Sequence, residues 1–332
     1  MSKVNSRFRT YDDLPDWLVV ADDIDERPIE LLPWGAHGLE LSIGDLNLFA
    51  AHPGSLKSTL ACKIAALVSH ERPVLVITEE DPHKATRPRL RLMGARLGNV
   101  WFARRPVTPE DLIPLAVEKG LGLVVGDPVS TAFVVTDSNN NDEVRYRIDD
   151  MQERVLAPHG VTFLGLVHFS KNTSRDTGLG RMMGASAFGQ MSRQVYVMGR
   201  APDDEDHVDV ADEKHSYSKR HPTVRHRIVP FPQHRGLVDL QEVCRVQRTA
   251  AEVVQGKPSA DGALATWVLQ TVIREGSVLL TDLCDRARDE NLGGRTKVRA
   301  VVRTLVDDPD TPLDTVRDGR QHRVFVQGGP QP

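Results

Sequence analysis

The strongest constraint in this sequence is the alternation of short apolar segments with longer amphipathic ones. Between residues 39 and 231, apolar runs of strand length are separated by stretches with one apolar face at helical spacing. Such alternation predicts a mostly parallel sheet with helices on both faces, because each helix returns the chain before the next strand. The expected strands are 46–51, 74–78, 100–103, 121–125, 161–167 and 194–198, and the expected helices are 57–68, 84–97, 110–118 and 143–156.

Composition excludes several classes of protein. The chain has 332 residues, which suits one large domain and one small domain. A net charge of −4 excludes a wholly basic DNA-coating protein, and 5% aromatic residues are too few for a platform of stacked rings. Three separated cysteines argue against a disulfide scaffold or a zinc module. Without a signal core or a membrane-length apolar run, we expect a cytoplasmic protein, in a bacterial cell or a phage-infected host, with no membrane partner.

The chain divides into four expected regions. Residues 1–32 are rich in Asp and Pro and are expected to form an N-terminal arm. Residues 33–235 hold the alternating pattern, followed by two further expected strands at 207–211 and 223–229, and residues 236–262 have the composition of a linker. In residues 263–330, three short helices precede two short strands, which is the order of a winged helix-turn-helix domain.

The segment AHPGSLKST, residues 51–59, joins the first expected strand to the first expected helix. A glycine-containing loop followed by Lys-Ser at this junction is typical of a phosphate-binding P-loop, in which Lys57 reaches the β and γ phosphates and Ser58 ligates Mg²⁺. The expected nucleotide-binding residues are Gly54, Ser55, Leu56, Lys57, Ser58 and Thr59.

This loop departs from the usual P-loop pattern at two positions. Ala51 and Leu56 stand where glycines are usual, and only Gly54 is present. Because a left-handed backbone is costly for a bulky side chain, we expect Leu56 to avoid a positive φ. An ordinary strand-to-helix turn with a surface lysine is the alternative interpretation.

Polar residues that end three other strands suit the same site, since ligands bind at the carboxyl edge of such sheets. In LGLVVGDPVS the apolar strand ends at Asp127, which suits Mg²⁺. Glu80 in PVLVITEEDP is the expected catalytic carboxylate because Pro128, not an acid, follows Asp127. His168 in VTFLGLVHFSK would sense the γ-phosphate. A solvated charge cluster and a hydrogen-bonded polar side chain are the alternatives for Glu80 and His168. The following segment offers possible trans-acting or sensor residues: Lys171, Arg175, Arg181 and Arg193.

These segments resemble the RepA-type replicative helicases of plasmids and phages, AAA-family ATPases with a RecA-like fold that form homohexamers. The resemblance covers roughly residues 33–230 and is carried by PGSLKST, LVITEEDP, VVGDPVS with DSNNNDEVR, LVHFSKN and RMMGASAFGQMSRQ, in that order. It implies a RecA-like P-loop NTPase core that uses ATP and Mg²⁺ at subunit interfaces and acts on DNA. It also implies phosphate binding by Lys57 and Ser58, a catalytic carboxylate at Glu80, Mg²⁺ at Asp127, a sensor at His168 and a trans-acting arginine at Arg193.

The last expected helix has an apolar face at residues 298, 301, 302 and 305. Basic residues surround this face, and a basic turn follows the helix. The expected DNA-binding residues are Arg295, Lys297, Arg299, Arg303 and Arg320, because a basic helix suits the major groove with phosphate contacts on either side. A solvated helix in a protein-binding winged helix is the alternative.

Two functions fit these observations. The first is a DNA motor, a replicative helicase with a primase or initiation partner. The second is an ATP-dependent DNA-binding, regulatory or recombination-associated protein without unwinding, which the irregular loop favours. A third function, that of a small-molecule kinase, is weakly supported, because the sequence shows no signature of a lid or an acceptor pocket. The four histidines of the charged segment, His207, His215, His221 and His226, have no tight ligand spacing, so we expect no metal site there.

Overall fold

The computed structural model describes residues 26, 28–79, 82–137, 139–169, 179, 182, 186–202, 204–256, 260–307, 311–318 and 321–327; at 82–83, 260–262, 318 and 321 it describes the backbone alone. The chain divides into two units, residues 1–30 and 31–332, and the described helices and strands lie in the second. Among them, none of the helices combines the length and apolar character needed to cross a membrane.

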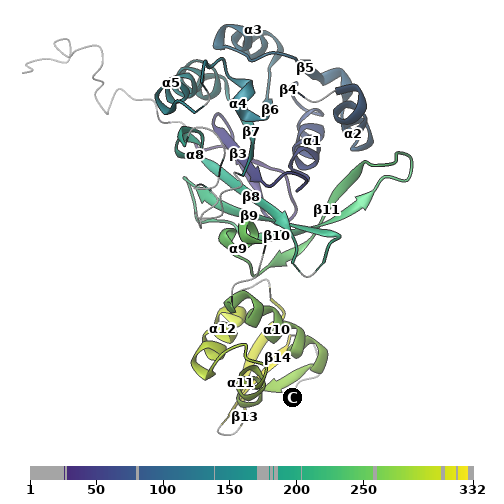
Figure 1. The fold of residues 1–332 in the computed structure, drawn as a ribbon, viewed down its shortest axis with the longest axis vertical. Coiled ribbons are helices and arrows are strands. Elements are labelled where there is room, and N and C mark those ends of the chain that lie inside the picture. Colours follow the sequence, from purple (N-terminus) through teal and green to yellow (C-terminus); the bar gives the residue numbers. More distant parts are fainter. Residues whose placement is uncertain are drawn as a thin grey trace, which may run out of the picture. The chain divides into compact units, whose positions relative to one another are not determined.

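A nine-stranded sheet with the order β11-β10-β9-β8-β3-β7-β6-β4-β5 forms the centre of the larger unit (Figure 1). Its six parallel strands are β3 (Leu46–Ala51), β4 (Val74–Thr78), β5 (Val100–Ala103), β6 (Leu123–Asp127), β7 (Thr162–His168) and β8 (Gln194–Arg200). Beyond β8 the sheet continues antiparallel with β9 (His207–His215), β10 (Thr223–Pro230) and β11 (Val238–Val246). The prediction of an α/β fold with a mostly parallel sheet is confirmed.

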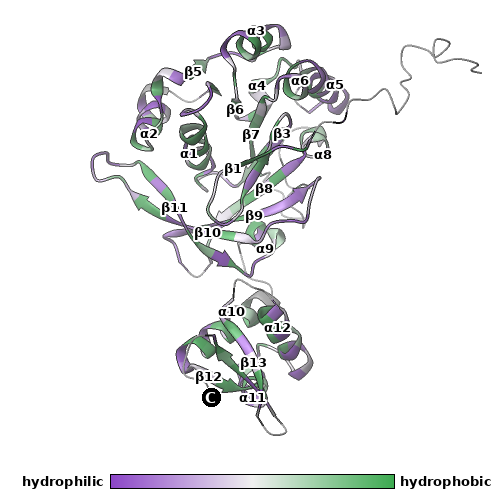
Figure 2. Cartoon of the chain, turned by 180° about the vertical axis from the view of Figure 1, so that it is seen from behind, coloured by the Kyte–Doolittle hydropathy of each residue, from purple (hydrophilic) through white to green (hydrophobic). Residues whose placement is uncertain are grey.

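Alternate side chains of β3 enter two hydrophobic cores on opposite faces of the sheet. Leu46, Leu48 and Ala50 belong to one core, and Phe49 and Ala51 to the other. The helices of the first core are α3 (Pro109–Lys119), α4 (Val129–Ala132), α5 (Asn141–Met151), α8 (Ala187–Met191) and α9 (Ala250–Gln255), and those of the second are α1 (Lys57–Val68) and α2 (Arg87–Leu92). In Figure 2 the central strands are mainly hydrophobic, whereas the outer helices are mixed.

Shorter elements complete this unit. A two-stranded hairpin, β1 (Leu31–Pro33) and β2 (Glu40–Ser42), precedes β3, so the expected arm ends in a strand. The remaining short helices in the described part of the unit are α6 (Ala157–His159), two π-helical turns (Pro82–Thr86 and Gln152–Leu156) and a 3₁₀ turn (Leu97–Asn99). The helix expected over 84–97 is shorter than predicted because the chain turns at Gly94, whose φ is +82°.

The expected linker, residues 236–262, is instead largely structured. β11 pairs with β10 along its whole length, and Val253 and Val254 of α9 are buried against the sheet. Thr249 and Glu252 form a capping box at the start of α9, in which each side chain accepts a hydrogen bond from the other residue's backbone N–H. The prediction was wrong because β11 is an edge strand rich in polar residues, most of them only partly buried, which resembles a loop in composition.

The C-terminal module contains α10 (Ala260–Glu275), α11 (Leu280–Asp289) and α12 (Arg295–Asp307). A three-stranded antiparallel sheet accompanies them, in the order β12 (Ser277–Leu279), β14 (Gln321–Val326), β13 (Leu313–Asp318). Val298, Val302 and Leu305 are buried in its core and Val301 is partly buried, which confirms the predicted apolar face of α12.

Substitution of Gly199 tests the packing of α9 on β8. A Cβ atom at Gly199 would overlap the carbonyl oxygen of Val253 in α9, and a backbone atom cannot move away as a flexible side chain can. We therefore expect Gly199→Ala to lower the free energy of unfolding by about 1–3 kcal/mol, measured by urea denaturation.

Gly98→Ala is the matched control, because its added Cβ would meet no atom within 4 Å among the described residues beyond its own chain neighbours and helical turn. Its free energy of unfolding should stay within about 0.5 kcal/mol of the wild type. Equal stability of Gly199→Ala and the wild type would contradict the packing of α9 on the sheet.

Candidate functional site

The turn between β3 and α1, residues 52–56, is named the phosphate loop. It follows the carboxyl end of a central parallel strand and leads directly into the 12-residue helix α1. The Ser55 N–H donates a hydrogen bond of 3.2 Å to the His52 carbonyl oxygen, which closes the turn. Among the described residues, no side chain caps the start of α1. Its first amides and its dipole therefore favour an anion at the loop.

Leu56 has a left-handed backbone, with φ of 66° and ψ of 21°. The expectation that this bulky residue would avoid a positive φ is wrong. Gly54 also has a positive φ, of 79°, so both positions adopt conformations that glycine favours. The leucine conformation costs about 1–2 kcal/mol. Packing of the Leu56 side chain against the core on the α1 face of the sheet offsets this cost.

Lys57 and His168 meet at the end of the phosphate loop. The register of β3 and β7 sets Ala51 opposite His168. The Lys57 Nζ atom lies 3.0 Å from Nδ1 and 3.2 Å from Nε2 of the His168 ring. Lys57 is 5% exposed, so its charge is largely removed from water. A buried ammonium beside helix amides is a strong attractor for phosphate oxygens.

Ser58 and Asp127 form the second contact of the site. The Ser58 hydroxyl donates a hydrogen bond of 2.6 Å to Asp127 Oδ2, and Asp127 is the last residue of β6. A hydroxyl oxygen next to a carboxylate oxygen is the donor set that Mg²⁺ prefers. These two residues fit the metal that a P-loop requires.

The expected site residues thus fall into three groups. Lys57, Ser58, Asp127 and His168 come together at the carboxyl edge of the sheet. Arg193 lies at the opposite edge, just before β8, with its Nε 3.8 Å from Asp45 Oδ1. The strand β8, seven residues long, separates it from the loop side of the sheet by roughly 23 Å. Lying outside the described residues are Glu80, Lys171, Arg175 and Arg181.

Arg200 is a site residue that the sequence analysis missed. It ends β8 on the same edge as the phosphate loop, and its Nη2 atom donates a hydrogen bond of 3.4 Å to the Gly54 carbonyl oxygen. Its place two residues after the expected strand 194–198 was an available signal. In the sequence, Arg175, Arg181 and Arg193 were competing candidates for such a role.

Comparisons with known proteins agree with this arrangement. A family profile described as "AAA domain" matches residues 7–174, half of the chain. The chain belongs to this family. The chain is therefore assigned as an AAA-domain ATPase. The matched span includes Lys57, Ser58, Asp127 and His168. The match begins at residue 7, so it also includes most of the expected arm.

Solved structures give more distant likenesses. One solved ATPase domain has 15% sequence identity and a TM-score of 0.45, over 59% of this chain and 84% of that chain. A DnaB-like replicative helicase, described with its interactions with primase, has 14% identity and a TM-score of 0.45. That likeness covers 56% of this chain, which spans 57% of the helicase. No curated protein matches the sequence.

Leu56→Gly and Leu56→Ala test the backbone of the phosphate loop. Both changes remove the same packing, but only alanine keeps a Cβ in the left-handed conformation. We expect Leu56→Gly to be more stable than Leu56→Ala by about 1 kcal/mol in urea unfolding. In an ordinary helical position alanine is the more stable residue by a similar amount. An alanine variant more stable than the glycine variant would therefore show that position 56 is not left-handed.

Proposed function

We propose that the chain is an ATP-driven DNA motor, a replicative helicase of the RepA type from a phage or plasmid. In this proposal it forms a homohexamer and hydrolyses ATP where two subunits meet. The observation that carries the proposal is the convergence of Lys57, Ser58, Asp127 and His168 at one edge of a parallel sheet, in a chain of the AAA-domain family. Phosphate binding, metal binding and sensing of the γ-phosphate require groups at these positions.

Each residue has a distinct task in the proposed mechanism. The amides of the phosphate loop and Lys57 bind the β and γ phosphates, while Ser58 and Asp127 would hold Mg²⁺. When bound, Mg²⁺ would neutralise part of the negative charge of the phosphates. His168 contacts Lys57, so a change at the γ-phosphate reaches β7 through that pair. Glu80, two residues beyond the end of β4, is the proposed base that orients the attacking water.

The arginines divide between the two edges of the sheet. Arg200 lies beside the phosphate loop of its own subunit. The Arg193 side chain is about half exposed at the other edge, so it would serve the nucleotide of a neighbouring subunit. A trans-acting arginine couples hydrolysis to the movement of one subunit against the next. Lys171 and Arg181 are further candidates for such a contact.

A second candidate function is ATP-dependent DNA binding, in regulation or recombination, without strand separation. The observation that favours it is Leu56, because a strained loop without the usual glycine suits slow turnover and a long-lived nucleotide state. The two candidates differ in one measurable property, the coupling of hydrolysis to unwinding.

ATP hydrolysis and strand displacement on a forked DNA separate the candidates. We expect the wild type to hydrolyse ATP faster with DNA and to separate the strands. Lys57→Ala and Glu80→Gln should each lower the hydrolysis rate by roughly 10²-fold, because each removes a group that stabilises the transition state. Lys63→Ala is the matched control, since Lys63 lies in the same helix but pairs with Asp239.

If the protein hydrolyses ATP but leaves the forked duplex intact under every loading condition, the helicase proposal is refuted and the second candidate function is favoured. Equal hydrolysis by the wild type and Lys57→Ala would contradict the assignment of the site itself.

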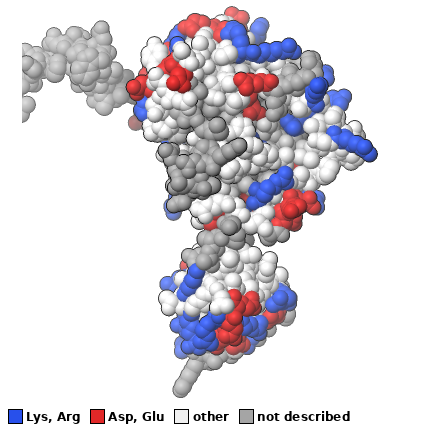
Figure 3. Space-filling view, in the orientation of Figure 1, with Lys and Arg blue, Asp and Glu red and all other residues white. Residues whose placement is uncertain are grey.

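We further propose that the C-terminal module is a winged helix that contacts DNA and a primase or initiation partner. Its helices and strands follow that order, and α12 carries the exposed side chains of Arg295, Arg299 and Arg303 around its buried face. The Nη2 atom of Arg295 also lies 3.4 Å from Oδ1 of Asp285 in α11. Figure 3 shows basic and acidic side chains close together on one face of the module. Arg320 of the wing lies outside the described residues.

The salt dependence of duplex binding tests this surface. We expect Arg295→Ala combined with Lys297→Ala to weaken binding and to lower the slope of log K against log salt by about 1.8, since each lost phosphate contact removes about 0.9. Arg274→Ala combined with Arg286→Ala is the control, because these two arginines pair with Glu275 outside α12. An unchanged slope in the α12 variant would favour a protein partner for the module.

A further inference from the structure

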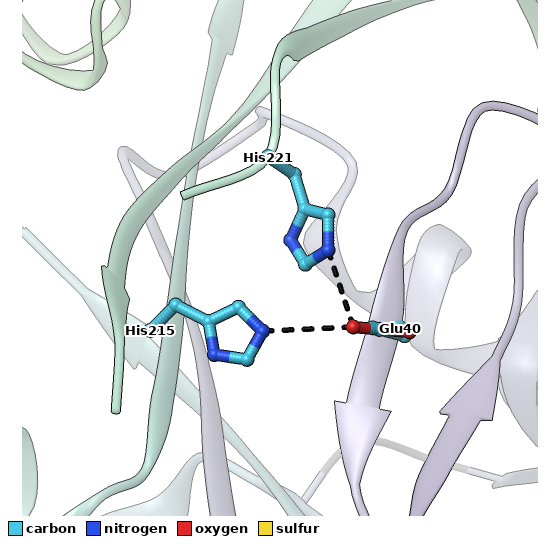
Figure 4. A group of neighbouring side chains, drawn as sticks. All are labelled: Glu40, His215 and His221. Carbon is cyan, nitrogen blue, oxygen red and sulfur yellow. Dashed lines mark ion pairs between the residues drawn. The ribbon is translucent and has the colours of Figure 1, made fainter. Parts of the chain in front are cut away.

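Two histidines and one glutamate from distant parts of the chain meet near the antiparallel side of the sheet (Figure 4). Glu40 lies in β2, His215 ends β9, and His221 lies in the turn before β10. The Glu40 Oε1 atom is 3.6 Å from His215 Nε2 and 3.2 Å from His221 Nε2. The three possible ligand atoms all lie within 4.8 Å of one another.

The cluster is largely removed from solvent. The side chains of His215, His221 and Glu40 are 1%, 15% and 22% exposed. His215 Nε2 is buried and has no hydrogen-bond partner among the described residues, although it is directed at the Glu40 carboxylate. A buried polar atom without a partner is costly, so its retention at this position requires an explanation.

Asp212 orients one of the two rings. Its side chain is fully buried, and its Oδ2 atom lies 2.9 Å from His221 Nδ1 and accepts a hydrogen bond of 3.1 Å from the His221 N–H. A carboxylate hydrogen-bonded to Nδ1 of a histidine keeps the ring proton on Nδ1 and leaves the lone pair on Nε2. His221 Nε2 is therefore prepared to act as a ligand.

The distances suit a small tetrahedral cation. With Zn–N and Zn–O bonds near 2.1 Å, neighbouring ligand atoms of a tetrahedral zinc lie about 3.4 Å apart. The two measured separations from Glu40 Oε1, 3.2 and 3.6 Å, are close to that value. Two imidazoles and one carboxylate form a typical donor set for Zn²⁺ and leave a fourth position for water. If His215 binds the ion through Nε2, its ring proton lies on Nδ1. Nδ1 can then no longer accept the long 3.4 Å hydrogen bond from the Tyr217 N–H, and among the described contacts this is the only hydrogen bond lost.

We propose that Glu40, His215 and His221 form a Zn²⁺ site in which Asp212 positions His221. The site ties the β1–β2 hairpin to the hairpin of β9 and β10. Tyr196 of the adjacent strand β8 holds the Glu40 backbone in place, because its Oη atom accepts a hydrogen bond from the Glu40 N–H and donates one to the Glu40 carbonyl oxygen. Spacing along the sequence hid this site, because Glu40 is far from both histidines in the chain. His207 and His226 take no part in it.

Zinc titration of the full chain, first stripped with a chelator, tests the proposal. We expect one zinc per chain by elemental analysis, and a melting temperature higher by roughly 5 °C at a free zinc concentration 100-fold above Kd. Co²⁺ should give the intense visible absorption of a four-coordinate ion. Glu40→Gln should lower zinc affinity more than 100-fold, and Asp212→Asn by about 10–100-fold.

Two control variants guard against zinc bound elsewhere. His207→Asn changes a histidine of the same hairpin that pairs with Asp204, and Cys244→Ser removes the exposed thiol. Both should keep the wild-type stoichiometry, affinity and melting shift. Glu40→Gln conserves size, so comparison of its circular dichroism with the wild type shows that it folds. Zinc binding equal in Glu40→Gln and the wild type, no binding by the folded wild type, or binding only of another metal would overturn the proposal.

Discussion

The parallel register of β3, β7 and β6 is the constraint on which the candidate site depends. It sets Ala51 opposite His168, and the pairing of β4 with β6 sets Thr78 opposite Asp127. Because neighbouring strands lie about 4.8 Å apart, side chains at these strand ends come within reach of α1. Lys57 and Ser58 are the first residues of that helix, and each contacts one strand end. The sheet therefore holds these four side chains of the candidate site together.

The phosphate loop keeps its shape through its neighbours as well as through its own residues. Leu56 adopts a conformation that its side chain disfavours, and it does so because β3 fixes one end of the loop and α1 the other. The hydrogen bonds of the Ser55 N–H and of Arg200 hold the intervening turn. The turn thus keeps its left-handed backbone at position 56 without a glycine there.

The antiparallel extension of the sheet belongs to the same cooperative structure. The side chain of Asp209 in β9 is fully buried. Its Oδ1 atom lies 2.8 Å from Nε of Arg225 in β10, and its Oδ2 atom lies 2.5 Å from Nη1 of Arg248. Removing one partner of such a buried group leaves an uncompensated charge, which is strongly destabilising. This network joins β9 and β10, which the sequence predicts as strands, to Arg248, which lies in the segment that the sequence predicts as a linker.

The sequence by itself determined the parallel strands and the turn between β3 and α1, and it marked Lys57, Ser58, Asp127 and His168 as residues that meet at one edge of the sheet, because local periodicity and the order of strand ends specify these features directly. It also determined the buried face of α12, through spacing along one helix. Tertiary structure alone decided the left-handed backbone at Leu56, the place of Arg200, the distance of Arg193 from the phosphate loop, and the inclusion of β11 in the sheet. It also brought Glu40 to His215 and His221. Each of these depends on contacts between segments far apart in the chain, and no local pattern records such contacts.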